Sequence, residues 1–69
     1  MAIRTLPSRK ELLRMRRLFR RCRGFLGQYP VRRIDEALRC LDCNPERAFE
    51  CYELARRYEP YARVELGLD

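Results

Sequence analysis

The chain contains no histidine and only three glycines among its 69 residues. Histidine is the side chain that most often acts as a general base near neutral pH, and it is also a common metal ligand. The glycines Gly24, Gly27 and Gly67 are too scattered to form a loop that cradles a phosphate. These absences argue against an enzyme, and we expect neither catalytic activity nor a cofactor of the protein's own.

Long apolar runs are also missing. No stretch approaches the roughly 18 consecutive apolar residues of a membrane-spanning helix, and residues 1–13 lack the apolar core of a signal peptide. A content of 46% hydrophobic and 38% charged residues indicates one small folded domain. A domain of this size buries only about 60% of its unfolded surface, so we expect a partner to stabilise it.

Acidic residues are nearly absent from the first half of the chain. Residues 1–33 hold eleven basic residues and a single acid, Glu11, whereas residues 34–69 hold five basic residues and nine acids. All the basic residues except Lys10 are arginine, whose planar guanidinium pairs bidentately with carboxylates and phosphates. The uneven charge predicts that the N-terminal half meets an anionic surface.

The first predicted helix covers residues 8–26. Ser8 and Glu11 form a capping box at its start, and Gly27 is expected to end it. On a helical wheel the apolar residues share one stripe: Leu12, Met15, Phe19, Cys22 and Leu26, widened by Leu18 and Phe25. The opposite side is basic, apart from Leu13, and carries Arg9, Lys10, Arg14, Arg16, Arg17, Arg20, Arg21 and Arg23.

Two further helices are predicted, and no strand pattern is present. Pro30 fits the first turn of a helix over residues 30–42, and Asn44-Pro45 opens a third helix that Pro60 ends or kinks. Their apolar faces are Val31, Ile34, Ala37, Leu38 and Leu41, and then Ala48, Tyr52, Ala55 and Tyr58. The third helix also fits a tetratricopeptide repeat, but the repeat period does not recur.

These elements predict an all-α fold, a small three-helix bundle with short turns. We expect three parts: an N-terminal arm over residues 1–7, a three-helix domain over residues 8–60, and a C-terminal turn and tail over residues 61–69. The acids of the later helices are expected to lie on solvated faces; they include Asp35, Glu36, Glu50 and Glu53.

Four cysteines could act as metal ligands or as core residues. Cys40 and Cys43 have the C-x-x-C spacing of zinc ligands and are the candidates for a metal site. They lie in a predicted helix, however, and no second close pair exists. Cys22 and Cys51 fall on apolar faces, where a free thiol behaves as a small hydrophobe. We favour free structural thiols and a reducing compartment over a metal site or a disulfide.

The basic side of the first helix is the main functional signal. Like charges repeat there at i, i+3 and i+4, which destabilises an isolated helix by about 0.2–0.5 kcal/mol per pair. A merely solvated surface would mix charge signs, so we interpret the basic side as a partner-binding face. The predicted partner-binding residues are Arg14, Arg16, Arg17, Arg20 and Arg21 on the first helix and Arg32, Arg33 and Arg39 on the second.

Several anionic partners fit this face. Nucleic acid fits the charge, with contacts to phosphates only, because Phe19 and Phe25 are expected to face the core. A membrane surface would compete with the core for the same apolar stripe and ranks last. An acidic protein would supply carboxylates that pair with the guanidinium groups.

Three segments of the chain resemble the LYR-motif family of small mitochondrial adaptor proteins over residues 8–58. The family's opening helix is similar to ELLRMRRLFRRCRGF (residues 11–25), and its second-helix signature is similar to VRRIDEALR (residues 31–39), where Leu38 replaces Phe and Arg39 matches Arg. Its third helix begins at a place similar to NPERAFECYELARRY (residues 44–58). No literal Leu-Tyr-Arg is present; Leu12-Leu13-Arg14, Met15-Arg16-Arg17 and Leu18-Phe19-Arg20 each align with it.

The resemblance implies a non-enzymatic helical adaptor that docks mitochondrial acyl carrier protein. In this family, arginines of the adaptor meet carboxylates of the acidic carrier, and the acyl-phosphopantetheine of the carrier inserts between the three helices. The pair then serves a larger assembly: a ribosome, a respiratory complex or the iron–sulfur machinery. We therefore expect the mitochondrial matrix, which the arginine-rich amphipathic N-terminus also favours; the cytoplasm is the alternative. The alternative function is a small basic RNA- or DNA-binding protein, such as a ribosomal or phage component.

Overall fold

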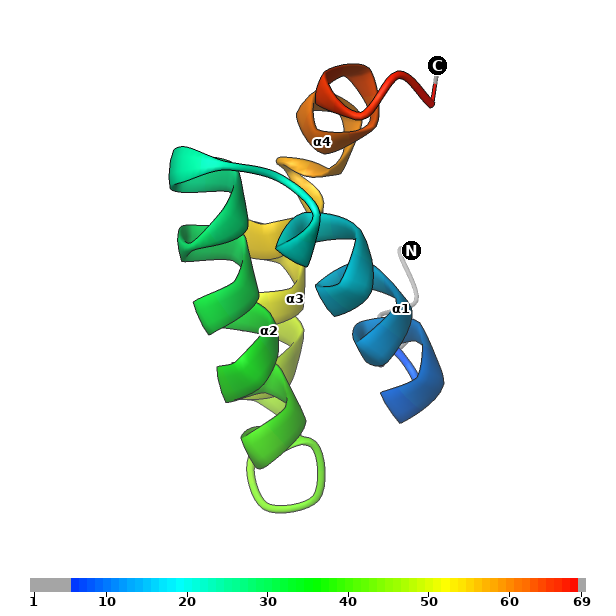
Figure 1. Cartoon of the computed structure of the whole chain (residues 1–69). Helices are drawn as coiled ribbons and strands as arrows, with labels where there is room; N and C mark the ends of the chain where they lie inside the picture. The colour runs from blue at the N-terminus through cyan, green and yellow to red at the C-terminus, as the bar shows by residue number, and fades with distance from the viewer. Residues whose placement is uncertain (1–5, 69) are drawn as a thin grey trace.

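The computed structural model describes residues 6–68 and contains no strand in that range. The helices in chain order are α1 (Arg9–Arg20), the 3₁₀ helix η1 (Gly24–Gly27), α2 (Tyr29–Cys40), α3 (Pro45–Arg56) and α4 (Glu59–Glu65). Helices α2 and α3 lie side by side as a hairpin, α1 packs beside it, and α4 lies across the end of the bundle at which η1 enters α2 (Figure 1). The predicted small three-helix bundle is therefore confirmed, with α4 as an addition to it.

Helix α1 begins where the capping box predicted. The side chain of Ser8 accepts a hydrogen bond of 3.1 Å from the backbone N–H of Glu11. Of the predicted N-terminal arm, Leu6 and Pro7 are not helical, and residues 1–5 lie outside the described part of the chain.

The prediction that the first helix reaches residue 26 is wrong. The backbone N–H of Cys22 bonds to the Phe19 carbonyl at 3.0 Å, which tightens the last turn, and Gly24 then adopts a left-handed φ of 65°. The chain therefore turns at Gly24 and not at Gly27, because residues other than glycine rarely adopt a left-handed φ. Gly27 has a different role: a Cβ there would lie 2.4 Å from the Cys22 carbonyl oxygen.

The prolines mark the later helix starts. Pro30 lies in the first turn of α2, and Pro45 lies in the first turn of α3, where Asn44 accepts a hydrogen bond of 3.3 Å from the Arg47 N–H. Both starts agree with the sequence. Pro60 does not end α3, which ends at Arg56; it lies in the first turn of α4. The segment predicted as a turn and tail thus contains most of a short helix that buries Ala62.

The core consists of the predicted apolar stripes. Phe19 is fully buried at the centre of the α1 stripe. The other buried hydrophobic side chains are Leu12, Met15, Leu18, Cys22, Val31, Ile34, Ala37, Ala48, Cys51, Ala55 and Ala62. Phe25 is the exception among the predicted core residues, because the turn at Gly24 leaves it 56% exposed. No helix within residues 6–68 is both long and apolar enough to cross a membrane.

Candidate functional site

Two of the predicted docking arginines lie at the flanks of α1 and pair with acids of neighbouring helices. Arg16 Nε donates a hydrogen bond of 2.7 Å to Asp35 Oδ1 on α2. Arg14 donates to Glu59 Oε2 on α4 at 3.2 Å and also to Glu11. The hydrogen bond to Glu11 is the main cause that raises the pKa of Arg14. These two arginines fasten α1 to the rest of the bundle, so their charge is already engaged within the molecule; their role as docking residues stays a prediction.

The acids of α2 are also engaged inside the molecule. Glu36 accepts a hydrogen bond of 2.6 Å from Arg47 on α3 and lies 3.2 Å from Arg33. The Arg47 hydrogen bond is the main cause that lowers the pKa of Glu36 below its usual range. The sequence predicted that Asp35 and Glu36 lie on a solvated face. In the structure they are half-buried and join α2 to α1 and to α3. Arg33 is likewise partnered, although its buried Nε has no hydrogen bond within the described residues.

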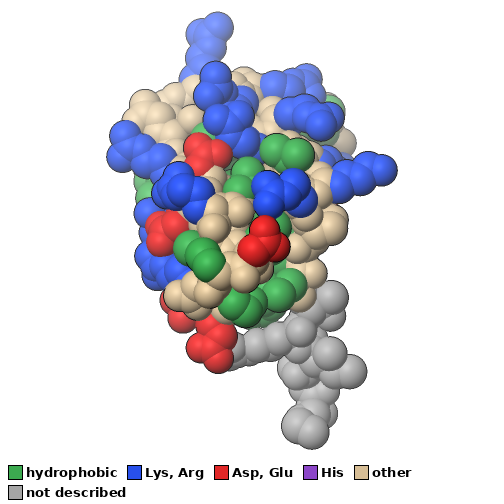
Figure 2. Space-filling view, turned by 90° about the horizontal axis from the view of Figure 1, so that it is seen from below, with side chains coloured by type: hydrophobic (Ala, Val, Ile, Leu, Met, Phe, Trp, Pro, Cys, Tyr) green, Lys and Arg blue, Asp and Glu red, His purple; other side chains and the backbone are tan. Residues whose placement is uncertain are grey.

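The remaining predicted arginines form an unpaired outer set. Arg17, Arg20 and Arg21 are exposed on α1 and have no ion pair within residues 6–68. Arg32 and Arg39 are exposed on the outer side of α2 and are unpaired over the same range. Cationic side chains project on most sides of the molecule when it is seen from the α2–α3 turn, with acids between them (Figure 2). Within residues 6–68, these five arginines therefore carry charge that no acid pairs with.

Helix α4 adds one arginine that the sequence did not identify. Arg63 lines a pocket of about 360 Å³ together with Arg14, Arg17 and Arg21 of α1, and Leu18 and Leu68 complete the walls. No acid is among these lining residues. The sequence carried no signal for this arrangement, because it depends on how α4 crosses α1. We refer to these six residues as the basic pocket.

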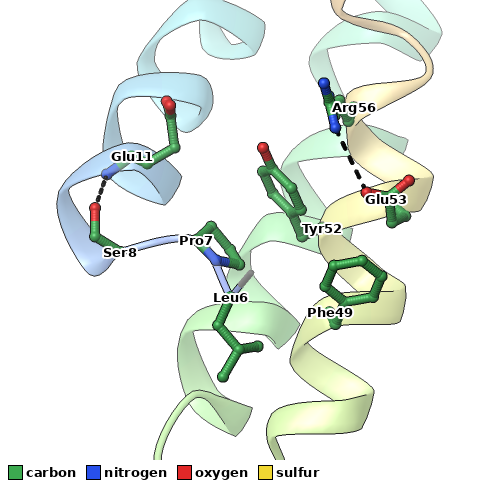
Figure 3. A pocket seen from close by; sticks show the side chains of 8 residues that line it. All are labelled: Leu6, Pro7, Ser8, Glu11, Phe49, Tyr52, Glu53 and Arg56. Atoms are coloured by element: carbon green, nitrogen blue, oxygen red, sulfur yellow. Dashed lines mark hydrogen bonds and ion pairs between the residues drawn. The ribbon is translucent and has the colours of Figure 1, made fainter. Parts of the chain in front are cut away.

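A second opening lies between the start of α1 and α3 (Figure 3). This groove has a volume of about 530 Å³ and is lined by Leu6, Pro7, Ser8, Glu11, Phe49, Tyr52, Glu53 and Arg56. Leu6 and Pro7 lie on one side of the groove and Phe49 and Tyr52 on the other, so apolar side chains border it together with charged ones. A shallower depression, lined by Ser8, Lys10, Glu11, Arg14 and Arg17, shares residues with both the groove and the basic pocket. The openings therefore follow one another along α1.

The cysteines are all unbridged. Cys22 and Cys51 are buried, as their positions on apolar faces predicted, and burial is the main cause that raises the pKa of each thiol. Cys40 is half-buried and Cys43 is exposed. Within the described residues, no three or more Cys, Asp or Glu side chains come together as a metal site.

Comparisons of the chain with protein-family models, with curated proteins and with solved structures find no match. Two surfaces are therefore the candidate sites. In the basic pocket, Arg17 and Arg21 are exposed and have no ion pair within residues 6–68. The groove between α1 and α3 is partly apolar.

Proposed function

We propose that this protein is a non-enzymatic helical adaptor that docks an acidic protein through the outer side of α1. One observation carries the proposal: Arg17 and Arg21 are exposed, have no ion pair within residues 6–68, and line with Arg63 a pocket that contains no acid. Carboxylates of a partner would supply counter-charges for Arg17 and Arg21.

The energetics favour such a partner. Arg17 lies three residues before Arg20 and four before Arg21, and like charges at these spacings destabilise a helix by about 0.2–0.5 kcal/mol per pair. Docked carboxylates would offset this repulsion through charge-assisted hydrogen bonds, which are shorter and stronger than neutral ones. Exposed charges of this kind contribute orientation and a fast association rate more than raw affinity.

Acyl carrier protein of the mitochondrial matrix is the partner that we propose. The resemblance to the LYR-motif family supports it, as does the three-helix architecture that this resemblance implies. The groove beside Leu6, Phe49 and Tyr52 would take the acyl chain of the carrier. The depression lies between this groove and the basic pocket, so the carrier's carboxylates and its acyl chain could bind along α1 at the same time. The complex would act as a subunit of a larger mitochondrial assembly.

Titration calorimetry with purified mitochondrial acyl carrier protein tests this proposal. We expect the acylated carrier to bind more tightly than the apo carrier, because only the acylated form fills the groove. The double variant Arg17→Glu/Arg21→Glu should abolish binding of both forms. The single variant Arg17→Glu should weaken binding of both forms, whereas its matched control Arg57→Glu, which changes the net charge equally on an exposed residue beyond the basic pocket and the groove, should retain binding. Equal affinity for the apo and acylated forms would contradict the role of the groove, and no binding of either would contradict the partner.

A further inference from the structure

Four aromatic rings meet where η1, α2 and α4 come together. Phe25 stacks on Tyr29 with ring centroids 5.3 Å apart and planes at 10°. Tyr58 contacts both edge-on, at 5.3 Å from Phe25 and 5.8 Å from Tyr29, and Tyr61 continues the series at 6.5 Å from Tyr58. We refer to Phe25, Tyr29, Tyr58 and Tyr61 as the aromatic surface.

The two end members of the aromatic surface are open to solvent. Phe25 is 56% exposed and Tyr61 is 65% exposed, although both are large rings in a domain with little apolar area to spare. Gly24 causes the exposure of Phe25, because its left-handed φ directs the following residue away from the core stripe. An exposed group of rings in contact with one another differs from isolated surface hydrophobic residues and marks a binding surface.

Arginines lie near the Phe25–Tyr29 end of the aromatic surface. The Arg33 guanidinium lies over the Tyr29 ring, with Cζ 5.6 Å from its centroid. Arg32 follows Tyr29 at i+3, and Arg23 precedes Phe25 by two residues; both are exposed and have no side-chain ion pair within residues 6–68.

The acids near the aromatic surface are already engaged. Glu36 pairs with Arg33 and Arg47. Glu65 accepts a hydrogen bond of 2.9 Å from the backbone N–H of Arg23. The Phe25–Tyr29 side of the aromatic surface is therefore cationic, whereas Glu59, which pairs with Arg14, and Glu65 lie on α4 with Tyr61. Exposed rings remain at both ends of the surface.

We propose that the aromatic surface is a binding site for single-stranded nucleic acid. One base would stack on Phe25 and another on Tyr61, while Arg23 and Arg32 would pair with the phosphates between and beside them. Stacking of bases on aromatic side chains within a cationic surface is the general means of binding single strands without sequence preference. An apolar protein partner would leave these arginines without counter-charges, whereas phosphates supply them. This site is independent of the acidic-protein interface of α1.

Fluorescence anisotropy of labelled oligonucleotides of about 12 nucleotides, a length within the usual range of single-strand sites, tests the proposal. Oligouridylate and oligothymidylate distinguish RNA from DNA, and a duplex of the same length is the comparison. We expect the single strands to bind more tightly than the duplex, whose bases are not free to stack. Each ring removed, Phe25→Ala or Tyr61→Ala, should weaken binding roughly tenfold. The ring-preserving changes Phe25→Tyr and Tyr61→Phe should restore it.

Two controls separate stacking from charge. Leu13→Ala truncates an exposed hydrophobic residue on α1 and should leave oligonucleotide binding unchanged. Arg32→Ala should reduce the slope of log affinity against log salt by about one, the loss of one phosphate contact. The proposal is overturned if the two alanine ring variants bind like the parent chain, if duplex and single strand bind equally, or if no oligonucleotide binds at about 50 mM salt. Self-association in sedimentation that the ring variants abolish, without oligonucleotide binding, would also overturn it and would assign the surface to a second copy of the chain.

Discussion

Arg16 and Arg17 are adjacent in the sequence and have opposite structural roles. Arg16 lies at the flank of α1 and donates to Asp35 at 2.7 Å, whereas Arg17 is exposed and has no ion pair within residues 6–68. Arg14 and Arg21 repeat the contrast, since Arg14 pairs with Glu59 and Arg21 does not pair within that range. The same residue type on one helix therefore serves either the fold or the surface, and what decides is whether an acid of another helix lies within reach.

The acids that make this division come from the second half of the chain. Asp35 lies on α2 and Glu59 on α4, and both reach only the sides of α1. The acidic half of the sequence thus neutralises part of the basic half within the folded molecule. The charge that remains on the outer side of α1 is what a partner meets.

Replacing a residue on the inner side of α1 should have the largest effect. Phe19→Ala removes a fully buried ring and should lower the free energy of unfolding by about 3–5 kcal/mol. A domain of this length has only roughly 3–10 kcal/mol in total, so the variant should be largely unfolded. Leu13→Ala on the outer side of the same helix should change stability by less than about 0.5 kcal/mol. Urea unfolding followed by circular dichroism measures the free energy of unfolding of both variants. An equal loss of stability in Phe19→Ala and Leu13→Ala would contradict the assignment of an inner and an outer side to α1.

Asp35→Asn should leave Arg16 without the acid that it pairs with in the parent chain. The substitution removes the charge that Arg16 meets, and a partly exposed pair of this kind contributes about 0.5 kcal/mol or somewhat more. We expect a small loss of stability together with unchanged or tighter binding to the acidic partner, because Arg16 becomes available. A double-mutant cycle with Arg16→Ala gives the coupling energy, and a coupling of zero would show that the pair does not fasten α1 to α2.

The smallest effect on stability should come from protonation of Glu36 at low pH. Its pKa is lowered in the folded protein, mainly by the hydrogen bond from Arg47, so its contribution to stability is present above the unfolded value of about 4.3. That contribution is lost as the pH falls through the lowered folded value. Glu36→Gln should therefore show a shallower loss of stability on acidification than the parent chain. Glu50→Gln, at a more exposed partner of the same Arg47, is the matched control and should follow the parent curve closely.

The sequence predicted features that depend on local chemistry. The Ser8 cap, the proline at the start of α2, the Asn44 cap and the buried stripe around Phe19 all lie where the pattern placed them. These features involve residues within a few positions of one another, so a helical wheel and capping rules are enough to find them.

Features set by contacts between distant elements escaped prediction. The helical pattern continued through Phe25, but the chain reverses at Gly24 so that α2 can pack against α1. Pro60 is predicted to end or kink the third helix, whereas it lies in the first turn of α4, which has too few residues to show its own period. The pairing of Arg14 with Glu59 and the place of Arg63 beside Arg21 depend on where α4 crosses α1, which no local pattern encodes.

The most direct test compares two double alanine variants of α1 for both stability and binding. Arg17→Ala/Arg21→Ala should lose most of the affinity for acyl carrier protein and keep the stability of the parent chain. Arg9→Ala/Arg16→Ala removes two α1 arginines that pair with Asp42 and Asp35 outside the basic pocket; it should lose about 0.5–1 kcal/mol of stability in total and retain the affinity. Affinity that falls equally in both variants, or that falls only in Arg9→Ala/Arg16→Ala, would contradict the assignment of the outer arginines to the partner.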